Sequence, residues 1–261
     1  MSADGLFDIN CWIGPWADAH EAVDGARELL ADMDRLGIER AVVAHSLAWQ
    51  HAPAVGNALL TQALQGHPRL LPCWGILPTG TEEMGTTEAL CADLARHGVR
   101  AVRVYPRDHA YPLATWMCWR LFGALAERRY LFLVDLEQLV PPTGLYDVTT
   151  GGWQDVARIC KTCPGLSVVL TRVGYRVLRV LGPLLEATSN LYLDLSYFAT
   201  HEGVEWLARR HGVDRLLFGT GNPLVDPAGA VTRLAYAGIA AQERARIARG
   251  NLERLLGQVS L

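Results

Sequence analysis

Short apolar runs recur along the chain, and each is followed by a segment whose apolar residues have helical spacing. The runs are rich in Val, Leu and Ile and are almost continuously apolar, which is typical of parallel strands buried on both faces. This pattern predicts strands over residues 6–10, 40–44, 70–75, 101–105, 131–135, 167–171, 191–195 and 215–218. The segments between them predict helices over residues 21–36, 53–65, 86–97, 114–128, 153–162, 177–187, 204–211 and 228–236.

Eight strand–helix units in 261 residues indicate an α/β fold, a single (β/α)8 or TIM barrel. Gly37, Gly98 and Gly212 follow the ends of three predicted helices and lead into the next strand. A doubly wound open sheet is the alternative with the same alternation. The chain has no linker that indicates a second domain, so we expect one domain over residues 1–261.

Composition and charge restrict the class of partner. Hydrophobic residues make up 50% of the chain and charged residues 20%, and the formal net charge is −3. This mildly acidic balance argues against nucleic acid and against an anionic membrane surface. There is no apolar run of the roughly 18 residues that a spanning helix needs, and the first residues lack the pattern of a signal peptide. We expect a cytoplasmic protein that binds a small molecule or a second copy of itself.

The sequence offers little support for redox or nucleotide chemistry. Its six cysteines are spread along the chain, and we interpret them as reduced thiols. Cys160 and Cys163 form a solitary Cys-x-x-Cys pair at a predicted helix end, which we interpret as incidental. The glycine-rich motifs that bind dinucleotides or phosphates are absent, so no nucleotide cofactor is expected.

Polar residues gather at the predicted C-terminal ends of the strands, where the functional groups of a barrel lie. Because side chains alternate along a strand, some of these residues should share a facing: Asp8 with Asn10 and Trp12, Arg103 with Tyr105, Asp135 with Glu137, and Asp194 with Ser196. Other strands end at or are followed by His45, Trp74, Arg172 and Asn222. Two arginines and several carboxylates at one rim suit a carboxylated substrate and proton transfer. The alternative is that they pair with one another for structural reasons.

Four segments, in order, resemble those of a known family. They are the Asp-x-Asn-x-Trp-x-Gly opening at residues 8–14, NLYLDLS at 190–196, LFGTGNP at 217–223 and GNLERLLG at 250–257. Together they resemble the amidohydrolase-related branch of the amidohydrolase superfamily, which includes decarboxylases similar to aminocarboxymuconate-semialdehyde decarboxylase. The resemblance runs from about residue 6 to residue 257 and implies a barrel with hydrolase or carbon–carbon lyase chemistry.

Members of that family bind a divalent metal through a His-x-His pair on the first strand, histidines after strands five and six, and an aspartate after strand eight. In this chain the matching positions hold Asn10, Trp12, Asp135, Arg172 and Gly221. An indole and a guanidinium only donate hydrogen bonds, and glycine has no side chain, so three of these residues cannot ligate. The residues at these positions therefore predict a site without metal or other cofactor, in which Arg172 supplies a fixed positive charge.

Three hypotheses follow for the function. The first is a metal-independent hydrolase or decarboxylase-like lyase for a small carboxylated or cyclic substrate, with Asp135, Arg172, Asp194 and His45 as candidate catalytic residues. Its candidate substrate-binding residues are Asn10, Trp12, Trp74, Arg103, Tyr105, Glu137 and Asn222. The second is an inactive barrel that binds a ligand or a partner protein through the tryptophans near the mouth. The third keeps a metal at relocated ligands.

Two further features concern the surroundings of the site. The longest connection, residues 136–152, follows the fifth predicted strand and is a candidate lid over the mouth. Barrels of this kind are often dimers, so a homodimer is also considered.

Overall fold

The computed structural model describes residues 5–16, 25–136 and 152–261. Within them, parallel strands form one sheet in the order β1 to β8. The strands are β1 (Leu6–Ile13), β2 (Ile38–His45), β3 (Leu70–Gly75), β4 (Ala101–Val104), β5 (Leu131–Asp135), β6 (Ser167–Thr171), β7 (Leu191–Asp194) and β8 (Leu216–Leu217). The Ile9 amide donates to the Phe218 carbonyl at 3.0 Å, which joins the two ends of the sheet. The predicted (β/α)8 barrel is confirmed.

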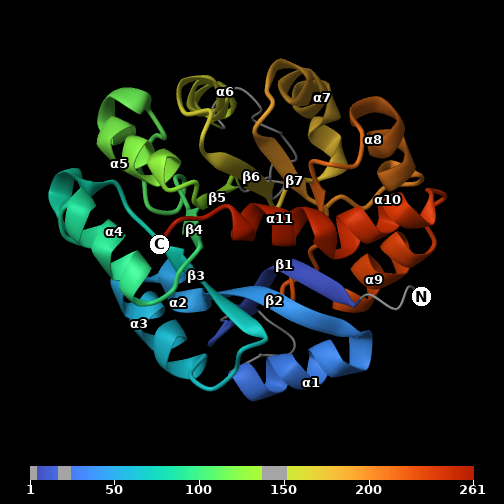
Figure 1. Cartoon of the computed structure of the whole chain (residues 1–261), viewed down its shortest axis with the longest axis horizontal. Helices are drawn as coiled ribbons and strands as arrows, with labels where there is room; N and C mark the ends of the chain where they lie inside the picture. The colour runs from blue at the N-terminus through green and yellow to red at the C-terminus, as the bar shows by residue number, and fades with distance from the viewer. Residues whose placement is uncertain (1–4, 17–24, 137–151) are drawn as a thin grey trace, which may run out of the picture.

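Helices surround the barrel on its outer face (Figure 1). The α-helices are α1 (Ala26–Leu36), α2 (Ser46–Gln50), α3 (Pro53–Ala63), α4 (Thr87–Arg96), α5 (Thr115–Glu127), α6 (Trp153–Thr162), α7 (Leu178–Ala187), α8 (Gly203–His211), α9 (Pro227–Ala235), α10 (Ala241–Ala245) and α11 (Asn251–Gly257). Short 3-10 turns lie at Thr79–Thr81 and Tyr175–Val177, and a π-helical turn lies at Arg246–Gly250.

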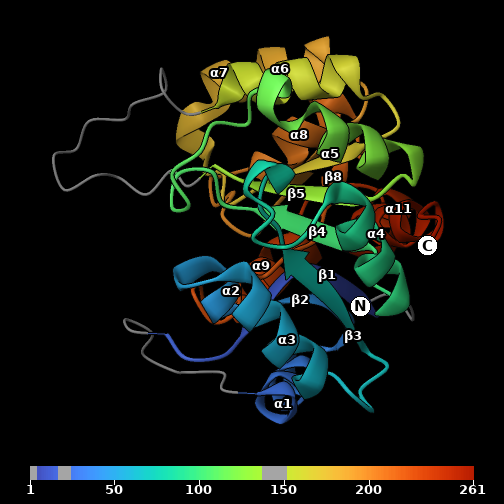
Figure 2. The same cartoon turned by 90° about the vertical axis from the view of Figure 1, so that its left-hand side faces the viewer.

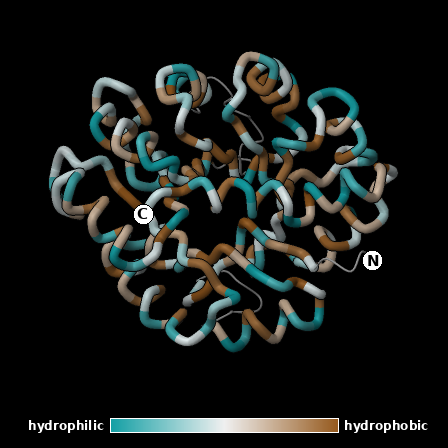
Figure 3. The backbone as a smooth tube through the Cα atoms, in the orientation of Figure 1, coloured by the Kyte–Doolittle hydropathy of each residue, from teal (hydrophilic) through white to brown (hydrophobic). Residues whose placement is uncertain are grey.

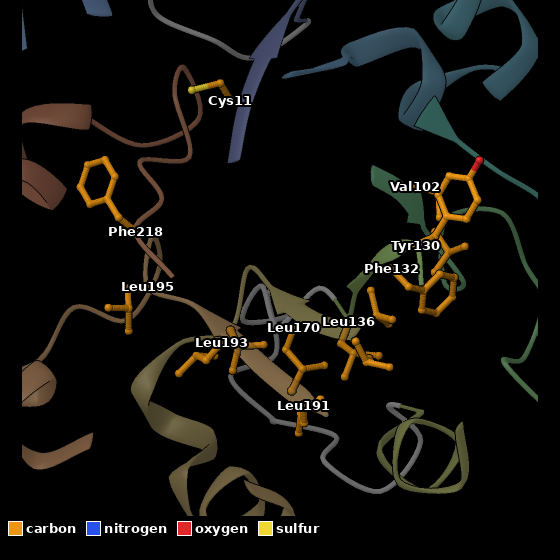
Figure 4. Close-up of a cluster of buried hydrophobic side chains, with 14 of the residues drawn as sticks. Cys11, Val102, Tyr130, Phe132, Leu136, Leu170, Leu191, Leu193, Leu195 and Phe218 are labelled. Atoms are coloured by element: carbon orange, nitrogen blue, oxygen red, sulfur yellow. The ribbon is translucent and has the colours of Figure 1, made fainter. Parts of the chain in front are cut away.

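The core has two layers, one on each face of the sheet. Alternate side chains such as Val42, Leu131, Leu133 and Val169 fill the barrel interior. The intervening side chains pack outward against the helices, where Figure 4 shows Val102, Phe132, Leu170 and Leu193 among them. In Figure 3, hydrophobic colours follow the strands and hydrophilic colours the outer turns. Burial on both faces explains why the strands are continuously apolar in sequence.

One end of the barrel is closed by α11. Its residues Leu252, Leu255 and Leu256 are buried together with Phe7 and Tyr192 from the strands. In the side view of Figure 2, α11 lies at the right-hand end of the barrel. This is the end at which the strands begin. The opposite end, where the strands finish, is not covered by α11 and holds the polar side chains described below.

The sequence prediction missed several elements. The short helix α2 directly follows β2, and α10 and α11 extend the chain beyond the eighth unit. The first helix begins at Ala26 rather than at residue 21, and β8 has only two residues. Short elements such as α2 and α10 have too few residues for helical periodicity to distinguish them from loops.

A β-bulge in β1 corrects the facing predicted for Asp8. Asp8 is paired with Ala41 and Cys11 with Val43, so three residues of β1 span two of β2. The extra residue reverses the alternation. Trp12 therefore faces the barrel interior with Ile9, whereas Asp8 contacts Cys11 and the segment after β8.

Within the described residues, no helix is long and apolar enough to cross a membrane. Most of the connection predicted as a lid, residues 137–151, lies outside the described residues.

Candidate functional site at the C-terminal end of the barrel

A ring of buried polar side chains lies inside the barrel at the C-terminal ends of the strands. Asn10 comes from β1, Arg103 from β4, Asp135 from β5, Thr171 from β6 and Asp194 from β7. Each is at most 2% exposed. Four of these residues were predicted from strand ends, and the structure brings them into one hydrogen-bonded set, which we call the polar ring.

Arg103 is the centre of the polar ring. Its guanidinium donates to Asn10 Oδ1 at 2.8 Å, to Asp135 Oδ2 at 2.8 Å and to Thr171 Oγ1 at 3.2 Å. Its Cζ atom lies 4.3 Å from the centroid of the Trp12 ring, within the range of a cation–π contact. Burial by itself would lower the pKa of Arg103, but the charge of Asp135, its hydrogen bond to Arg103 and smaller contributions from neighbouring groups together raise the pKa above its usual value. Arg103 is therefore a permanent buried cation.

The Asn10 amide is fixed from both ends. Its Nδ2 donates to Asp194 Oδ2 at 2.8 Å and to Ser196 Oγ at 3.1 Å. Its Oδ1 accepts from Arg103 and from the Trp12 indole N–H, the latter at 3.1 Å. Because a carbonyl oxygen has two lone pairs, both acceptor positions of this amide are used. Asn10 thus links the acidic and basic sides of the polar ring.

Asp194 is an acid of the polar ring whose ionisation is altered by burial. Burial raises its pKa to about 6, even though hydrogen bonds from Ser196 act in the opposite direction. The Ser196 hydroxyl donates to Oδ2 at 2.6 Å and the Ser196 amide to Oδ1 at 2.9 Å. A carboxyl group with this pKa can hold a proton near neutral pH and release it at slightly higher pH.

Arg172 approaches the same carboxylate as Arg103. Its guanidinium lies 3.5 Å from Asp135 Oδ1, and its Cζ atom is 4.3 Å from the centroid of the Trp49 ring. The backbone of Arg172 has a φ of +57°, which is uncommon for a residue with a side chain. Asp135 therefore lies between two guanidinium groups, and Arg103 rather than Arg172 makes its shorter contact.

Four aromatic rings pack together, and three of them, Trp12, Trp49 and Tyr105, lie next to Arg103 or Arg172. The Trp12 ring centroid is 5.4 Å from that of Trp16, 5.7 Å from that of Trp49 and 6.0 Å from that of Tyr105. The Trp49 indole is held by a 2.6 Å hydrogen bond to Asp108 on the loop after β4. The buried Tyr105 hydroxyl and the Arg103 Nε have no hydrogen-bond partner among the described residues. We call these four rings the aromatic cluster.

The structure places three predicted site residues elsewhere. Trp74 belongs to the outer core and lies 5.0 Å from the His97 ring, since Cys73 and Gly75 take the inward positions of β3. The Asn222 side chain donates to Asp32 on α1, at 3.3 Å. His45 caps α2, where its Nδ1 accepts from the Leu47 amide at 3.2 Å, and burial lowers its pKa. Trp74 therefore points away from the barrel interior, whereas the site roles of Asn222 and His45 stay predictions. Glu137 lies outside the described residues.

Comparisons with known proteins show the family to which the chain belongs. The family model described as Amidohydrolase, Amidohydro_2, matches residues 13–258. The chain belongs to this amidohydrolase family. A sequence search of curated proteins gave no match.

Solved structures with the same fold include decarboxylases of aromatic acids. This amidohydrolase-family chain is 18% identical to the 2,6-dihydroxybenzoate decarboxylase from Rhizobium, with a TM-score of 0.74 over 97% of this chain and 99% of that one. It is 16% identical to a 5-carboxyvanillate decarboxylase from Novosphingobium aromaticivorans, with a TM-score of 0.77 over 98% and 97%. A dihydroxybenzoic acid decarboxylase from Polaromonas sp. JS666 is 16% identical, with a TM-score of 0.72 over 97% of each chain. At this identity the likeness shows the fold.

The last two of these structures contain bound manganese. In the described part of this amidohydrolase-family chain, no three His, Cys, Asp or Glu side chains are grouped so that they could hold a metal ion. Manganese prefers several carboxylate, carbonyl or water ligands. At the polar ring, the oxygens of Asn10, Asp135 and Thr171 instead accept hydrogen bonds from Arg103. The described residues of this site therefore do not fit a divalent metal.

Sequence reasoning missed some of the residues that complete this site. Thr171 was recognised only as the end of a strand, although its hydroxyl accepts from Arg103 and donates to the Val134 carbonyl at 3.3 Å. Its place at the last residue of β6, directly before Arg172, was the available signal. Asp108, which accepts the hydrogen bond from the Trp49 indole, lies in a loop. A loop has no regular spacing of apolar residues, so the sequence pattern could not predict where this side chain lies.

Proposed function

We propose that this protein is an enzyme of the decarboxylase-like branch of its family, a carbon–carbon lyase or hydrolase that acts on a small aromatic or cyclic carboxylate without a divalent metal. The observation that carries the proposal is the meeting of two guanidinium groups on Asp135, each stacked on an indole of the aromatic cluster. Guanidinium edges suit the planar geometry of a carboxylate, and the rings suit a flat apolar body.

The known relatives support the choice of substrate class. One of the similar structures holds 2,6-dihydroxybenzoate, and another holds a hydroxylated methoxy-nitrobenzoic acid. An aromatic acid of this type combines one anionic group with one flat ring. In this chain, Arg172 and Arg103 would orient the carboxylate, and Trp12, Trp49 and Tyr105 would contact the ring.

Loss of carbon dioxide from such an acid leaves the bonding electron pair on the ring carbon, which must take up a proton. Asp135 lies between the two guanidinium groups, and Asp194 has a pKa raised by burial to about 6. We assign the proton delivery to Asp194, and we assign to Asp135 the positioning of the two guanidinium groups. His45 is not assigned a role, because its ring nitrogen Nδ1 is used to cap α2.

A second candidate function is ligand binding without catalysis. One observation favours it, since the oxygens of both Asp135 and Asp194 already have protein partners, and both carboxyl groups are at most 2% exposed. A general acid must come within hydrogen-bond reach of the atom that it protonates. In this second account the polar ring only holds the ligand.

The experiment that tests the proposal is a screen of hydroxylated and methoxylated benzoic acids, with product detection by chromatography and binding measured by thermal shift. The variant Arg172→Met removes one guanidinium, and Arg120→Met, at an exposed position of α5, is the matched control. We expect turnover by the wild type and by the Arg120 variant, and at least a hundredfold loss in the Arg172 variant.

Ligand-dependent stabilisation without product would favour the binding function. Full activity of the Arg172 variant would exclude the assigned role of this arginine, and the absence of both turnover and binding would contradict both candidates.

A further inference from the structure

Arg103 fills the centre of the polar ring in a way that bears on metal binding. Its guanidinium reaches from β4 to side chains of β1, β5 and β6. Arg103 is only 1% exposed, and the indole of Trp12 lies against its guanidinium. A cation already lies where side chains from four strands converge.

We propose that the Arg103 guanidinium is the resident cation of this barrel and takes the place of a divalent metal, so that the polar ring binds neither manganese nor zinc. This inference deepens the proposed metal-independent function and assigns the replacement to Arg103, whereas the sequence alone had pointed to Arg172. It concerns which cation the site holds and is independent of whether the site turns over a substrate.

The oxygen atoms around Arg103 are already used as acceptors. Asn10 Oδ1 accepts from Arg103 and from the Trp12 indole, which accounts for both of its lone pairs. Thr171 Oγ1 accepts from Arg103 while its own proton goes to the Val134 carbonyl. A metal that entered here would have to displace these hydrogen bonds.

The two carboxylates of the polar ring are engaged in the same way. Asp135 meets Arg103 through Oδ2 and Arg172 through Oδ1. Asp194 accepts from the Ser196 amide through Oδ1, and from Asn10 and the Ser196 hydroxyl through Oδ2. Zinc and manganese sites generally need three or more well-placed donors.

Charge leads to the same conclusion. A guanidinium stays protonated under all ordinary conditions and cannot leave the site, because it is covalently part of β4. A divalent ion next to it would add two positive charges in a buried environment, where repulsion between like charges is strong. The geometry therefore favours one permanent cation over an exchangeable one.

The decisive experiment measures metal binding directly, without reference to activity. Manganese is added to the purified wild-type protein, and the electron paramagnetic resonance signal of free aqueous Mn²⁺ is followed. Zinc is measured by elemental analysis after dialysis. We expect the manganese signal to remain that of the free ion and the zinc content to stay far below one equivalent. Stoichiometric binding of either metal would overturn the inference.

A variant gives the complementary test. Arg103→Ala leaves a guanidinium-sized space between Asn10, Asp135 and Thr171, and small cations can be offered to it. We expect ethylguanidinium to raise the Tm of this variant by several degrees and ethylammonium to have a much smaller effect, with the wild type unchanged. If the variant is unfolded alone, recovery of its circular dichroism signal by ethylguanidinium is the same test. Equal effects of the two cations, or no effect of either, would contradict the inference.

The outcomes separate this inference from the proposed function. A wild-type protein that binds no metal and turns over no substrate would leave Arg103 as the resident cation and remove the proposed activity. A wild-type protein that holds one equivalent of metal and is active would overturn Arg103 as the resident cation and the metal independence of the proposed reaction, while the lyase or hydrolase activity itself would stand.

Discussion

Two regions at the same end of the barrel each contain a buried aspartate, and they differ in what surrounds it. In the polar ring, Asp135 lies between the guanidinium groups of Arg103 and Arg172. At the seam where β1 meets β8, Asp8 accepts from the backbone amides of Asn10 and Thr220, at 2.8 and 3.0 Å, and from the Thr220 hydroxyl. The first aspartate has charged partners and the second has neutral ones.

This difference indicates two different tasks. The bonds of Asp8 all run to β1 itself and to the segment after β8, so they close the barrel. Burial raises the pKa of Asp8, and its hydrogen bonds only partly offset this. The polar ring instead concentrates opposite charges and flat rings inside the mouth, an arrangement that suits binding more than closure. Burial of an aspartate in a barrel strand does not by itself mark a functional residue.

The largest effect is expected from breaking the polar ring at its centre. The variant Arg103→Met leaves the carboxylate of Asp135 buried without its shortest ion pair, and removal of one partner of a buried pair costs roughly 3–5 kcal/mol. Unfolding in guanidinium chloride, followed by circular dichroism, measures this loss. Arg103→Lys keeps the charge and should lose less. Equal stabilities for wild type and Arg103→Met would show that the ion pair does not hold the polar ring together.

The pH dependence of the free energy of unfolding tests whether burial raises the pKa of Asp194. In the folded protein its pKa is raised from 3.8 to about 6, so the unfolded chain releases its proton first as the pH rises. Between these two values the unfolded state therefore binds fewer protons than the folded state, and the free energy of unfolding falls with increasing pH. The fall attributable to this group is at most about 3 kcal/mol.

The control for this prediction is Asp194→Asn, which keeps the size of the side chain and cannot titrate. The free energies of unfolding of wild type and variant are obtained from denaturation curves measured below and above the pH range from 3.8 to about 6. The fall of the free energy of unfolding across this range should be missing in the variant. An identical pH dependence in the two proteins would contradict a raised pKa at Asp194.

A smaller effect is expected at the seam. The variant Asp8→Asn replaces a carboxylate oxygen that accepts from Thr220 by an amide donor, and an unsatisfied buried group costs about 2 kcal/mol. Because the bonds of Asp8 run only within the seam, the Kd for an aromatic carboxylate, measured by calorimetry, should stay within about twofold of the wild-type value. Such a change is small compared with the tenfold change in Kd that 1.4 kcal/mol would cause. A large loss of binding would mean that the seam and the polar ring are not separate regions.

The smallest effect is expected at Trp74, which the sequence suggested for the site and the structure places in the outer core. Its indole N–H is buried and has no hydrogen-bond partner among the described residues. The variant Trp74→Phe therefore loses no hydrogen bond there, and we expect the smaller ring to cost about 1–2 kcal/mol of stability with unchanged ligand binding. Denaturant titration and calorimetry test both points.

The sequence predicted the barrel well because buried parallel strands and their helices recur with one pattern, and each of the eight units repeats the same information. It predicted the site less well, because the geometry of the site depends on the positions of single residues and not on a repeated pattern. The bulge in β1 turns Asp8 away from Asn10, and no periodicity reveals a bulge in advance. Strand ends predicted Arg103 and Asp135, but only the fold could show that the guanidinium of Arg103 bridges β1, β5 and β6.

If the polar ring, and not the seam, is the functional site, ligand affinity should depend on the arginines that meet Asp135 and not on Asp8. Isothermal titration calorimetry with 2,6-dihydroxybenzoate and related aromatic carboxylates measures this on wild type, Arg172→Met and Asp8→Asn. We expect binding to wild type and to the Asp8 variant, and a loss of at least tenfold in affinity for the Arg172 variant. Undiminished binding by Arg172→Met, or the absence of binding by the wild type, would contradict it.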